Sequence, residues 1–448
     1  METIIILKWM ANFSNCKLIM KKIKKIIGII ALSAFCFFVS NCSGGESDGP
    51  EKNPTTHNDN SGGGNQEGNN SEGGNQQGNN SGGSNNGTSG HGVATAFSGD
   101  GSKQNPYLIS GTPELRKLSK DVNEGNTYQG KYFRMTNDII FNSNVLNSNG
   151  RPNISDKFEE WTPIGCDSKC SFCGSFDGNG YSISGIYINQ GEQENLGLFG
   201  FLSGEVKNLT IKDSYLRGRL NIGGIAGSVL TFTSNPVIIN CRNYTCIQAE
   251  DHAGGIFGYN EDSPCVIDRC SNYGIISGGG NLAGIAGFAS KTTIKNCANY
   301  GLIGNILDEN KHAWYLAGIV SFGRRSSGLK IYNCVNFGDL KGNDSRSGIC
   351  VNYPDSIANC VNYGKVYYGI CEEVNNTNKV VKTYFLNIAC ESGIGVKRIY
   401  SSLQCKEMSG VEMQSKEFLD QLNGNARTLG SDYAKWRFGK EGFPELEI

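Results

Sequence analysis

One phrase recurs between residues 238 and 364: an isoleucine, two residues, a cysteine, one residue, an asparagine, an aromatic residue and usually a glycine. Its copies occupy residues 238–244, 267–274, 294–301, 331–338 and 357–364. Glycine-rich phrases that contain Gly-Ile accompany them, at residues 223–227, 254–258, 283–287, 317–319 and 347–349. A repeat of about 30 residues indicates a solenoid, in which each unit needs its neighbours to bury its apolar face. The chain is therefore expected to fold as a stack of similar coils.

The spacing within the phrase predicts β-strands separated by a bend. Side chains alternate between the two faces of a strand, so an isoleucine and a cysteine three positions apart cannot share a face of one straight strand. A bend must lie between them. The asparagine that follows the cysteine by two positions lies either on the cysteine's face or in the next turn, where asparagine tolerates the left-handed conformation. Stacked coils would carry columns of Ile, Cys and Asn, which predicts an all-β solenoid.

The composition fits a stack of tight turns and disfavours a nucleic-acid-binding class. The 448 residues include 61 glycines, 19% of the residues are charged, and the formal net charge is −1. Without residues 1–41 the chain has 35 basic and 41 acidic residues, a net charge of −6. Binding to a phosphate backbone requires a basic face. We therefore expect no nucleic-acid partner, and we expect the protein to be a monomer.

The N-terminal segment, residues 1–41, has the pattern of a leader with an export signal. Residues 20–25 are basic, residues 26–39 are apolar, and Cys42 follows shortly after. The apolar stretch is short for a membrane span, which needs about 20 residues. The segment resembles the lipobox of bacterial lipoproteins, which implies that Cys42 is lipidated; a plain secretory signal is the alternative. We expect translation to start at Met20 and lipid to anchor the protein in a bacterial outer membrane, at the cell surface.

The remainder divides into a tether and a folded part. Residues 42–93 contain almost no apolar side chains and repeat a serine- and glycine-rich phrase every ten residues, so they cannot form a core. Residues 94–160 are expected to hold the first coils and a capping helix, with Thr112 as its N-cap and proline at its first position. Residues 161–385 hold the repeats. Residues 386–448 are expected to form a last coil and a small helical cap.

Further residues of the chain resemble a known repeat family, and this resemblance implies the handedness of the stack. Residues 161–165, 174–186 and 196–200, together with the Gly-Ile phrases, resemble the GLUG repeats of bacterial surface proteins. The resemblance covers residues 97–448, and the tail from residue 415 is similar to the C-terminal caps of Bacteroidetes members. It implies a right-handed parallel β-helix that is secreted and displayed at the surface. It carries no catalytic residues that can be transferred to this chain.

The cysteines of the repeats are expected to be buried thiols. Of 17 cysteines, 14 lie after residue 93. Five of them occupy one repeat position, where stacked side chains point in parallel rather than at each other: Cys241, Cys270, Cys297, Cys334 and Cys360. A reduced cysteine in such a column acts as a small apolar side chain. We expect the same of Cys350 and Cys371, which follow Gly-Ile phrases.

Three further cysteines, Cys166, Cys170 and Cys173, cluster within one turn. One local disulfide with a spare thiol is the first expectation. A zinc site is the alternative, but it would need a fourth ligand, and no histidine is near in the sequence. We therefore expect neither a metal nor a cofactor.

The sequence gives little support to catalysis. It contains no H-E-x-x-H metalloprotease motif and no G-x-S-x-G nucleophile elbow. A polysaccharide lyase or glycosidase on a β-helix is the enzymatic alternative, since acids such as Glu250, Asp251, Glu261 and Asp262 are available, although such clusters are most often solvated loops. A structural spacer is a third reading. The favoured interpretation is a surface-anchored binding or adhesion module for a glycan or host protein.

An insertion between Cys297 and Cys334 supplies the candidate binding residues. Insertions in solenoids emerge as loops on one face, which is often the binding face. Its aromatic side chains either offer flat area to a ligand or pack back on the coil. The candidates in and after the insertion are Lys311, His312, Trp314, Tyr315, Arg324 and Arg325.

Overall fold

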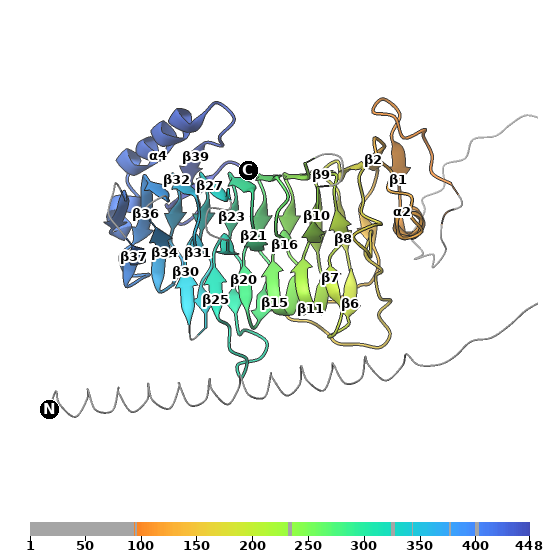
Figure 1. The fold of residues 1–448 in the computed structure, drawn as a ribbon, viewed down its shortest axis with the longest axis horizontal. Helices are drawn as coiled ribbons and strands as arrows, with labels where there is room; N and C mark the ends of the chain where they lie inside the picture. The colour runs from red at the N-terminus through yellow and green to blue at the C-terminus, as the bar shows by residue number, and fades with distance from the viewer. Residues whose placement is uncertain are drawn as a thin grey trace, which may run out of the picture. The chain divides into compact units, whose positions relative to one another are not determined.

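The computed structural model describes residues 94, 96–231, 235–323, 328–342, 344–375, 378–398 and 403–448. Over these residues the chain winds into coils that stack through parallel strands (Figure 1). Successive coils add strands to three long sheets, and within this part of the chain the antiparallel pair of strands lies in the C-terminal segment. The predicted fold, a right-handed parallel β-helix, is confirmed.

The first two sheets contain ten strands each. The first consists of β1 (Tyr107–Ile109), β2 (Tyr132–Met135), β4 (Ser175–Asp177), β9 (Glu205–Lys207), β13 (Val237–Ile239), β17 (Cys265–Asp268), β22 (Thr292–Lys295), β27 (Lys330–Tyr332), β32 (Ser356–Ala358) and β35 (Lys379–Val381). The second consists of β3 (Ile139–Ile140), β5 (Ser182–Ser184), β10 (Thr210–Lys212), β14 (Arg242–Asn243), β18 (Ser271–Asn272), β23 (Ala298–Asn299), β28 (Val335–Asn336), β33 (Val361–Asn362), β36 (Thr383–Leu386) and β38 (Cys405–Met408).

The third sheet contains 18 strands, because each coil contributes more than one strand to it. It consists of β6 (Tyr187–Asn189), β7 (Glu194–Leu196), β8 (Phe199–Leu202), β11 (Tyr215–Gly223), β12 (Ala226–Val229), β15 (Cys246–Gly254), β16 (Phe257–Asn260), β19 (Ile276–Gly278), β20 (Asn281–Ala283), β21 (Ala286–Ala289), β24 (Ile303–Gly304), β25 (Tyr315–Ala317), β26 (Val320–Phe322), β29 (Leu340–Lys341), β30 (Ser345–Ser347), β31 (Cys350–Asn352), β34 (Tyr368–Asn375) and β37 (Ser392–Arg398).

The bend predicted between the isoleucine and the cysteine is present in all copies of the phrase. The residue directly before the cysteine has a φ between +51° and +55°, and it links a strand of the first sheet to one of the second. These residues are Asn240, Arg269, Asn296, Asn333 and Asn359. Asparagine is enriched in this left-handed region because its short side chain bonds locally. Arg269 adopts the same conformation, and its guanidinium forms an ion pair with Asp268 at 2.7 Å.

The asparagine that follows the cysteine lies on the cysteine's face and not in the turn. These side chains are fully buried and form the asparagine ladder: Asn243, Asn272, Asn299, Asn336 and Asn362. The Nδ2 of each of the first four donates a hydrogen bond to Oδ1 of the asparagine on the next coil, at 2.7–2.9 Å, and Nδ2 of Asn362 donates to the carbonyl oxygen of Gly364 at 3.0 Å. A buried amide without a partner costs about 1–3 kcal/mol. The ladder therefore fixes the register of neighbouring coils.

The aromatic residues of the phrase form a second column, which faces outward from the second sheet. Their rings stack at centroid separations of 4.6, 4.7, 5.0 and 4.7 Å in the order Tyr244, Tyr273, Tyr300, Phe337 and Tyr363. Such spacings match the coil repeat of about 4.8 Å. The outward column thus repeats the register that the asparagine ladder sets inside.

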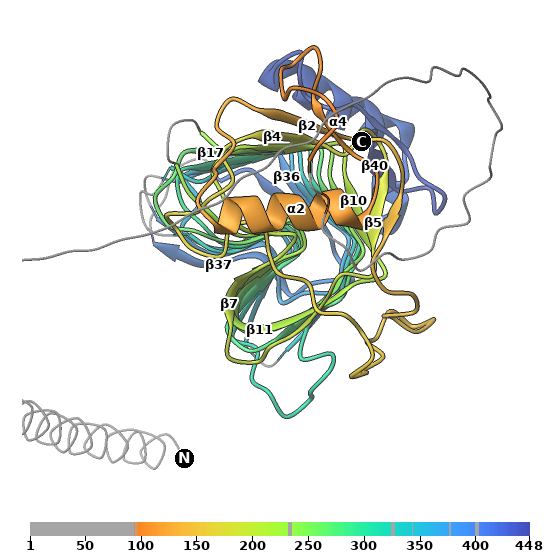
Figure 2. The same ribbon diagram turned by 90° about the vertical axis from the view of Figure 1, so that its right-hand side faces the viewer.

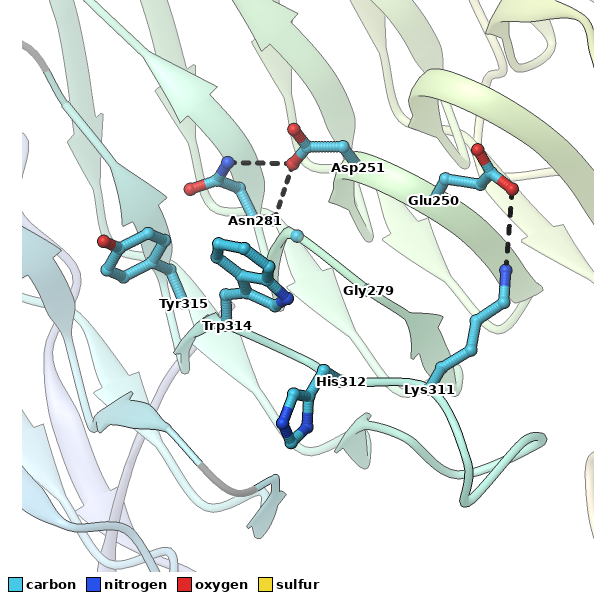
Figure 3. A pocket seen from close by; sticks show the side chains of 9 residues that line it. Glu250, Asp251, Gly279, Asn281, Lys311, His312, Trp314 and Tyr315 are labelled. Carbon is cyan, nitrogen blue, oxygen red and sulfur yellow. Dashed lines mark hydrogen bonds and ion pairs between the residues drawn. The ribbon is translucent and has the colours of Figure 1, made fainter. Parts of the chain in front are cut away.

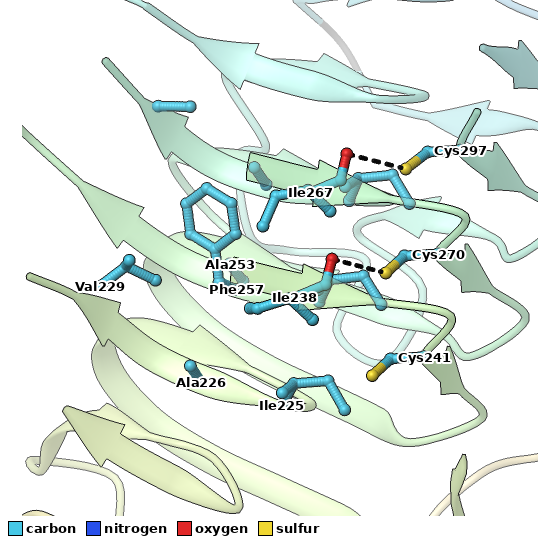
Figure 4. Close-up of a cluster of buried hydrophobic side chains, with 14 of the residues drawn as sticks. Ile225, Ala226, Val229, Ile238, Cys241, Ala253, Phe257, Ile267, Cys270 and Cys297 are labelled. Carbon is cyan, nitrogen blue, oxygen red and sulfur yellow. Dashed lines mark hydrogen bonds between the residues drawn. The ribbon is translucent and has the colours of Figure 1, made fainter. Parts of the chain in front are cut away.

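The cysteines of the phrase form an inward column of thiols (Figure 4). The Sγ of Cys270 lies 3.6 Å from the carbonyl oxygen of Ile238, and that of Cys297 lies 3.9 Å from the carbonyl oxygen of Ile267. Burial raises the pKa of both thiols well above the ordinary value. Among the described residues no disulfide joins any pair of the 14 cysteines. Cys350 and Cys371 are also buried thiols, as expected.

The buried column predicts inert thiols. Cys297 should resist a thiol reagent in the native protein and react after denaturation, because it is fully buried and its thiolate is disfavoured. Cys297→Ser should lower the free energy of unfolding by about 1–3 kcal/mol, because it places a hydroxyl in an apolar column. Mass spectrometry of reagent-labelled peptides measures the first effect, with the exposed Cys166 as the reactive control. A mapped disulfide at Cys297 would contradict the column.

The disulfide expected among Cys166, Cys170 and Cys173 is wrong. All three are thiols in the structure. Cys166 is exposed, whereas Cys173 is buried with its Sγ 3.6 Å from the carbonyl oxygen of Ser171. The side chains of one short turn therefore face different surroundings instead of each other.

The first coil is covered by helix α2 (Thr112–Asn123), which crosses the end of the stack in Figure 2. Its side chains Leu115, Leu118 and Val122 are buried in the main core. The N-cap is Gly111 and makes no side-chain cap bond, so the expected threonine cap is wrong by one residue. This cover removes the open end from solvent, as a stack of parallel strands requires.

The C-terminal segment packs against the outward face of the second sheet. It consists of α3 (Gly410–Met413), α4 (Lys416–Leu429), β39 (Trp436–Phe438) and β40 (Pro444–Leu446). Phe418 and Leu422 of α4 share one buried cluster with Val335 and Val361. The Nδ2 of Asn359 donates to the carbonyl oxygen of Leu422 at 3.1 Å. Among the helices of the described residues, none has the length and apolar character to cross a membrane.

Candidate functional site

A hollow of about 430 Å³ opens beside the insertion, on the third sheet (Figure 3). It is lined by Glu250, Asp251, Gly279, Gly280, Asn281, Lys311, His312, Trp314 and Tyr315. The structure thus brings together four of the residues expected from the sequence, Lys311, His312, Trp314 and Tyr315. The other two candidates, Arg324 and Arg325, lie outside the described residues, as does Cys42.

The floor of the hollow exists because two glycines occupy the middle coil. A Cβ on Gly280 would lie 2.2 Å from Oδ1 of Asp251, on the coil before it. A Cβ on Gly279 would lie 3.2 Å from the carbonyl oxygen of His312, on the coil after it. Gly280 also has a φ of +50°, which glycine adopts at little cost. The missing side chains leave a gap between the acidic residues of the preceding coil and the insertion of the following coil.

The insertion, residues 306–315, leads from β24 into the first residue of β25 and is tied to the coil beneath it. The amide of Leu307 donates to Oγ of Ser277 at 2.9 Å. The amide of Tyr315 donates to the carbonyl oxygen of Gly280 at 3.1 Å, and Asn281 pairs with Tyr315 in the register of β20 and β25. These bonds fix both ends of the loop, so its side chains project over the glycine floor.

The two aromatic residues of the insertion have different roles. Trp314 is 56% exposed, and its indole stands at the mouth of the hollow in Figure 3. Tyr315 is partly buried and packs against Ala283, Ala317 and Val351, with its ring centroid 5.9 Å from that of Phe322. The sequence left open whether these rings face a ligand or the coil. Trp314 faces the hollow, and Tyr315 belongs to the packing beneath it.

The charged groups come from two parts of the hollow: Glu250 and Asp251 lie on β15, across from the insertion, and Lys311 lies on the insertion with Trp314. The Nζ of Lys311 lies 3.7 Å from Oε1 of Glu250, so these two charges pair across the middle coil that carries Gly279 and Gly280. Oδ1 of Asp251 accepts hydrogen bonds from the amides of His252 and Asn281, at 2.8 and 2.7 Å, and from Nδ2 of Asn281 at 2.8 Å.

His252 lies behind the Asp251 carboxylate and remains uncharged at neutral pH. Burial lowers the pKa of His252, and the Asp251 carboxylate opposes this effect only in part. Its Nδ1 is 3.2 Å from Oδ1 of Asn221, and its Nε2 is 3.6 Å from Oδ2 of Asp251. The negative charge of Asp251 is therefore held by neutral donors.

This arrangement suits binding better than catalysis. One carboxylate of the hollow is paired with a lysine, and the other accepts three hydrogen bonds, so neither is buried in the apolar surroundings that keep a general acid protonated. Oδ1 of Asn281 is buried and has no hydrogen-bond partner among the described residues. Across those residues no group of three or more His, Cys, Asp or Glu side chains is arranged to hold a metal ion.

Comparisons with known proteins give partial likenesses. No family model matches the chain. Among curated proteins, 173 residues are 27% identical to "Halomucin" of Haloquadratum walsbyi, covering 38% of this chain and 2% of that protein. A further 120-residue match is 33% identical to "Putative Gly-rich membrane protein" of Evansella cellulosilytica, covering 26% of this chain and 12% of that protein. The chain therefore spans a small fraction of the length of both.

One solved structure is also similar to this chain. It is described as a "putative immunoglobulin A1 protease" from Bacteroides ovatus, with 18% identity and a TM-score of 0.49. The match covers 78% of this chain and 94% of that chain.

Proposed function

We propose that this chain is a binding or adhesion module displayed at a bacterial surface, and that its ligand binds in the hollow beside Trp314. The observation that carries the proposal is the exposed indole of Trp314 above a floor of two glycines. An exposed aromatic side chain beside a formed pocket with a few polar groups is the usual composition of a ligand site. The proposed lipid at Cys42 and the tether of residues 42–93 would present this site away from the membrane.

The carbohydrate-active enzyme is the weaker candidate. A glycosidase needs one carboxylic acid that is kept protonated by its surroundings and a second carboxylate that is free to act. In the hollow, the side chain of Glu250 is 58% exposed and paired with Lys311, and Asp251 already accepts three hydrogen bonds. Binding without turnover is therefore the expected behaviour.

Separate alanine substitutions test the proposed site. Trp314→Ala should weaken ligand binding by about tenfold or more, the loss typical of a hot-spot aromatic residue, and leave the melting temperature unchanged, because the indole is 56% exposed. Tyr315→Ala should lower the melting temperature, because it removes packing against Ala283 and Val351. Binding of the purified chain to arrayed glycans and arrayed host proteins, with thermal unfolding measured in parallel, separates the two effects.

Three outcomes decide between the candidate functions. Binding that is lost with Trp314→Ala, without product formation, supports the binding module. Cleavage of a bound glycan would favour the enzyme instead. Full binding by Trp314→Ala would place the ligand elsewhere, and the absence of any binding by the unaltered chain would favour a structural spacer.

A further inference from the structure

The chemistry of the hollow narrows the class of its ligand. We infer that the hollow beside Trp314 selects an uncharged pyranose of a glycan and rejects acidic sugars. This inference rests on the proposed binding function and specifies the ligand of the same site. The inference rests on three features of the hollow: the exposed indole, the glycine floor and the net negative charge of the wall formed by Glu250 and Asp251.

The indole and the floor form a slot for a flat, partly apolar ring. Trp314 presents an aromatic face at the mouth, and Gly279 and Gly280 offer backbone without side chains below it. A pyranose has one face of C–H groups that packs against an aromatic ring and a rim of hydroxyls that needs hydrogen-bond acceptors. The carboxylates of Glu250 and Asp251 supply acceptors on the opposite wall. A volume of about 430 Å³ lies in the range of small-molecule sites.

The charges on that wall are not balanced. Lys311 is the cation of the hollow that neutralises Glu250, at 3.7 Å. Asp251 is held by neutral N–H donors, and burial keeps its neighbour His252 uncharged. The Asp251 side chain is still 34% exposed, so its charge reaches the hollow. A uronic or sialic acid would bring a second negative charge to this wall, and like charges in contact oppose binding.

The fluorescence of Trp314 provides the readout. Of the tryptophans in the described residues, Trp161 and Trp436 are 5% and 2% exposed, whereas Trp314 is 56% exposed. A ligand that packs on Trp314 should therefore change the emission of this side chain selectively. The full-length chain is titrated with oligosaccharides that end in glucose, galactose, mannose, N-acetylglucosamine or N-acetylgalactosamine. Oligosaccharides that end in galacturonate, glucuronate or sialic acid, and trilysine as a peptide, are titrated in parallel.

Two variants and one control give the test its specificity. Trp314→Ala should weaken binding of the uncharged sugar by about tenfold or more, the loss typical of a hot-spot aromatic residue. Glu250→Gln leaves Lys311 without its carboxylate partner, so acidic sugars should bind more tightly to this variant than to the unaltered chain. Phe438→Ala removes an aromatic residue that is 42% exposed in the C-terminal segment, and it should leave binding unchanged.

The outcomes separate this inference from the proposed function. Saturable binding of an uncharged sugar that is lost with Trp314→Ala, together with weaker binding of acidic sugars, supports it. Equal or tighter binding of acidic sugars overturns the inference, and so does binding of trilysine or an arrayed protein alone through Trp314; in both cases the binding function stands. No response to any probe, with no binding to glycan or protein arrays, overturns both.

Discussion

Gly284→Ala is expected to lower the free energy of unfolding by about 3 kcal/mol or more, because the added methyl group would collide with two structural features of the stack. Its Cβ would lie 2.3 Å from the carbonyl oxygen of Gly318 on the next coil and 2.4 Å from Oδ1 of Asn299. Asn299 cannot move aside, since its amide is bonded to Asn272 and Asn336 on the two neighbouring coils. Chemical unfolding followed by circular dichroism measures the loss.

The same substitution elsewhere in the chain provides the control. Gly424 lies inside helix α4, and the nearest atom to an added Cβ is a side-chain nitrogen of Arg427 at 3.8 Å. Gly424→Ala is therefore expected to stabilise the protein by about 0.5–1 kcal/mol, the helix preference of alanine over glycine. If Gly284→Ala lowers the free energy of unfolding and Gly424→Ala raises it, the loss at Gly284 is due to the collision with the ladder and not to alanine itself. A Gly284→Ala protein as stable as the unaltered chain would contradict this prediction, because it would show that Asn299 can move aside without loss of stability.

The repeat predicted the strands, the bend and a column of asparagines, but it left open whether this column lies inside the coil or in the turn. The period-two alternation of side chains was enough to require a bend between the isoleucine and the cysteine. Whether the following asparagine faces inward depends on the residue before the cysteine, which takes the left-handed conformation even where it is Arg269. It also depends on space inside the coil. Gly284 provides that space for Asn299 from 15 positions earlier in the chain, and local patterns do not reveal such a contact.

The sequence predicted only the part of the candidate site that the insertion contributes. The insertion interrupts the repeat length, which pointed to Lys311, His312, Trp314 and Tyr315. The opposite wall and floor come from coils that precede the insertion, so finding them requires the register between strands. Pairing of Asn281 with Tyr315 places Gly280 beside Trp314. An alignment of the repeats that matched Asn281 with Tyr315 would have placed Gly279 and Gly280 next to the insertion, and it would have identified them as the floor of the hollow.

The sequence was sufficient to predict the state of the repeat cysteines but not that of the three cysteines clustered in one turn. The column of repeat cysteines followed from their shared position, and the structure shows buried thiols there. For Cys166, Cys170 and Cys173, closeness in sequence suggested a bond that the turn does not allow, because Cys173 points inward and Cys166 outward. Sequence spacing fixes how far apart two cysteines lie along the chain, but the direction of their side chains is set by the backbone of the turn.

Cys42→Ala is expected to release the protein from the membrane fraction completely, because the proposed anchor consists of acyl chains on this side chain. Buried methylene groups contribute about 0.8 kcal/mol each, and stable anchoring needs more than one chain. Residues 43–93 have almost no apolar side chains that would replace them. Metabolic labelling with a fatty acid and separation of membrane from soluble fractions measure the two consequences, loss of label and loss of attachment.

Cys36→Ala is the matched control for this prediction. Cys36 lies within the apolar stretch of residues 26–39, which the proposed processing removes, so its substitution should leave both labelling and attachment intact. The released Cys42→Ala protein should keep the melting temperature of the β-helix, since residues 42–93 have almost no apolar side chains from which a core could be built. A Cys42→Ala protein that still fractionates with the membrane would overturn the lipid anchor, and a released protein that still binds its ligand would show that anchoring and recognition are carried by separate parts of the chain.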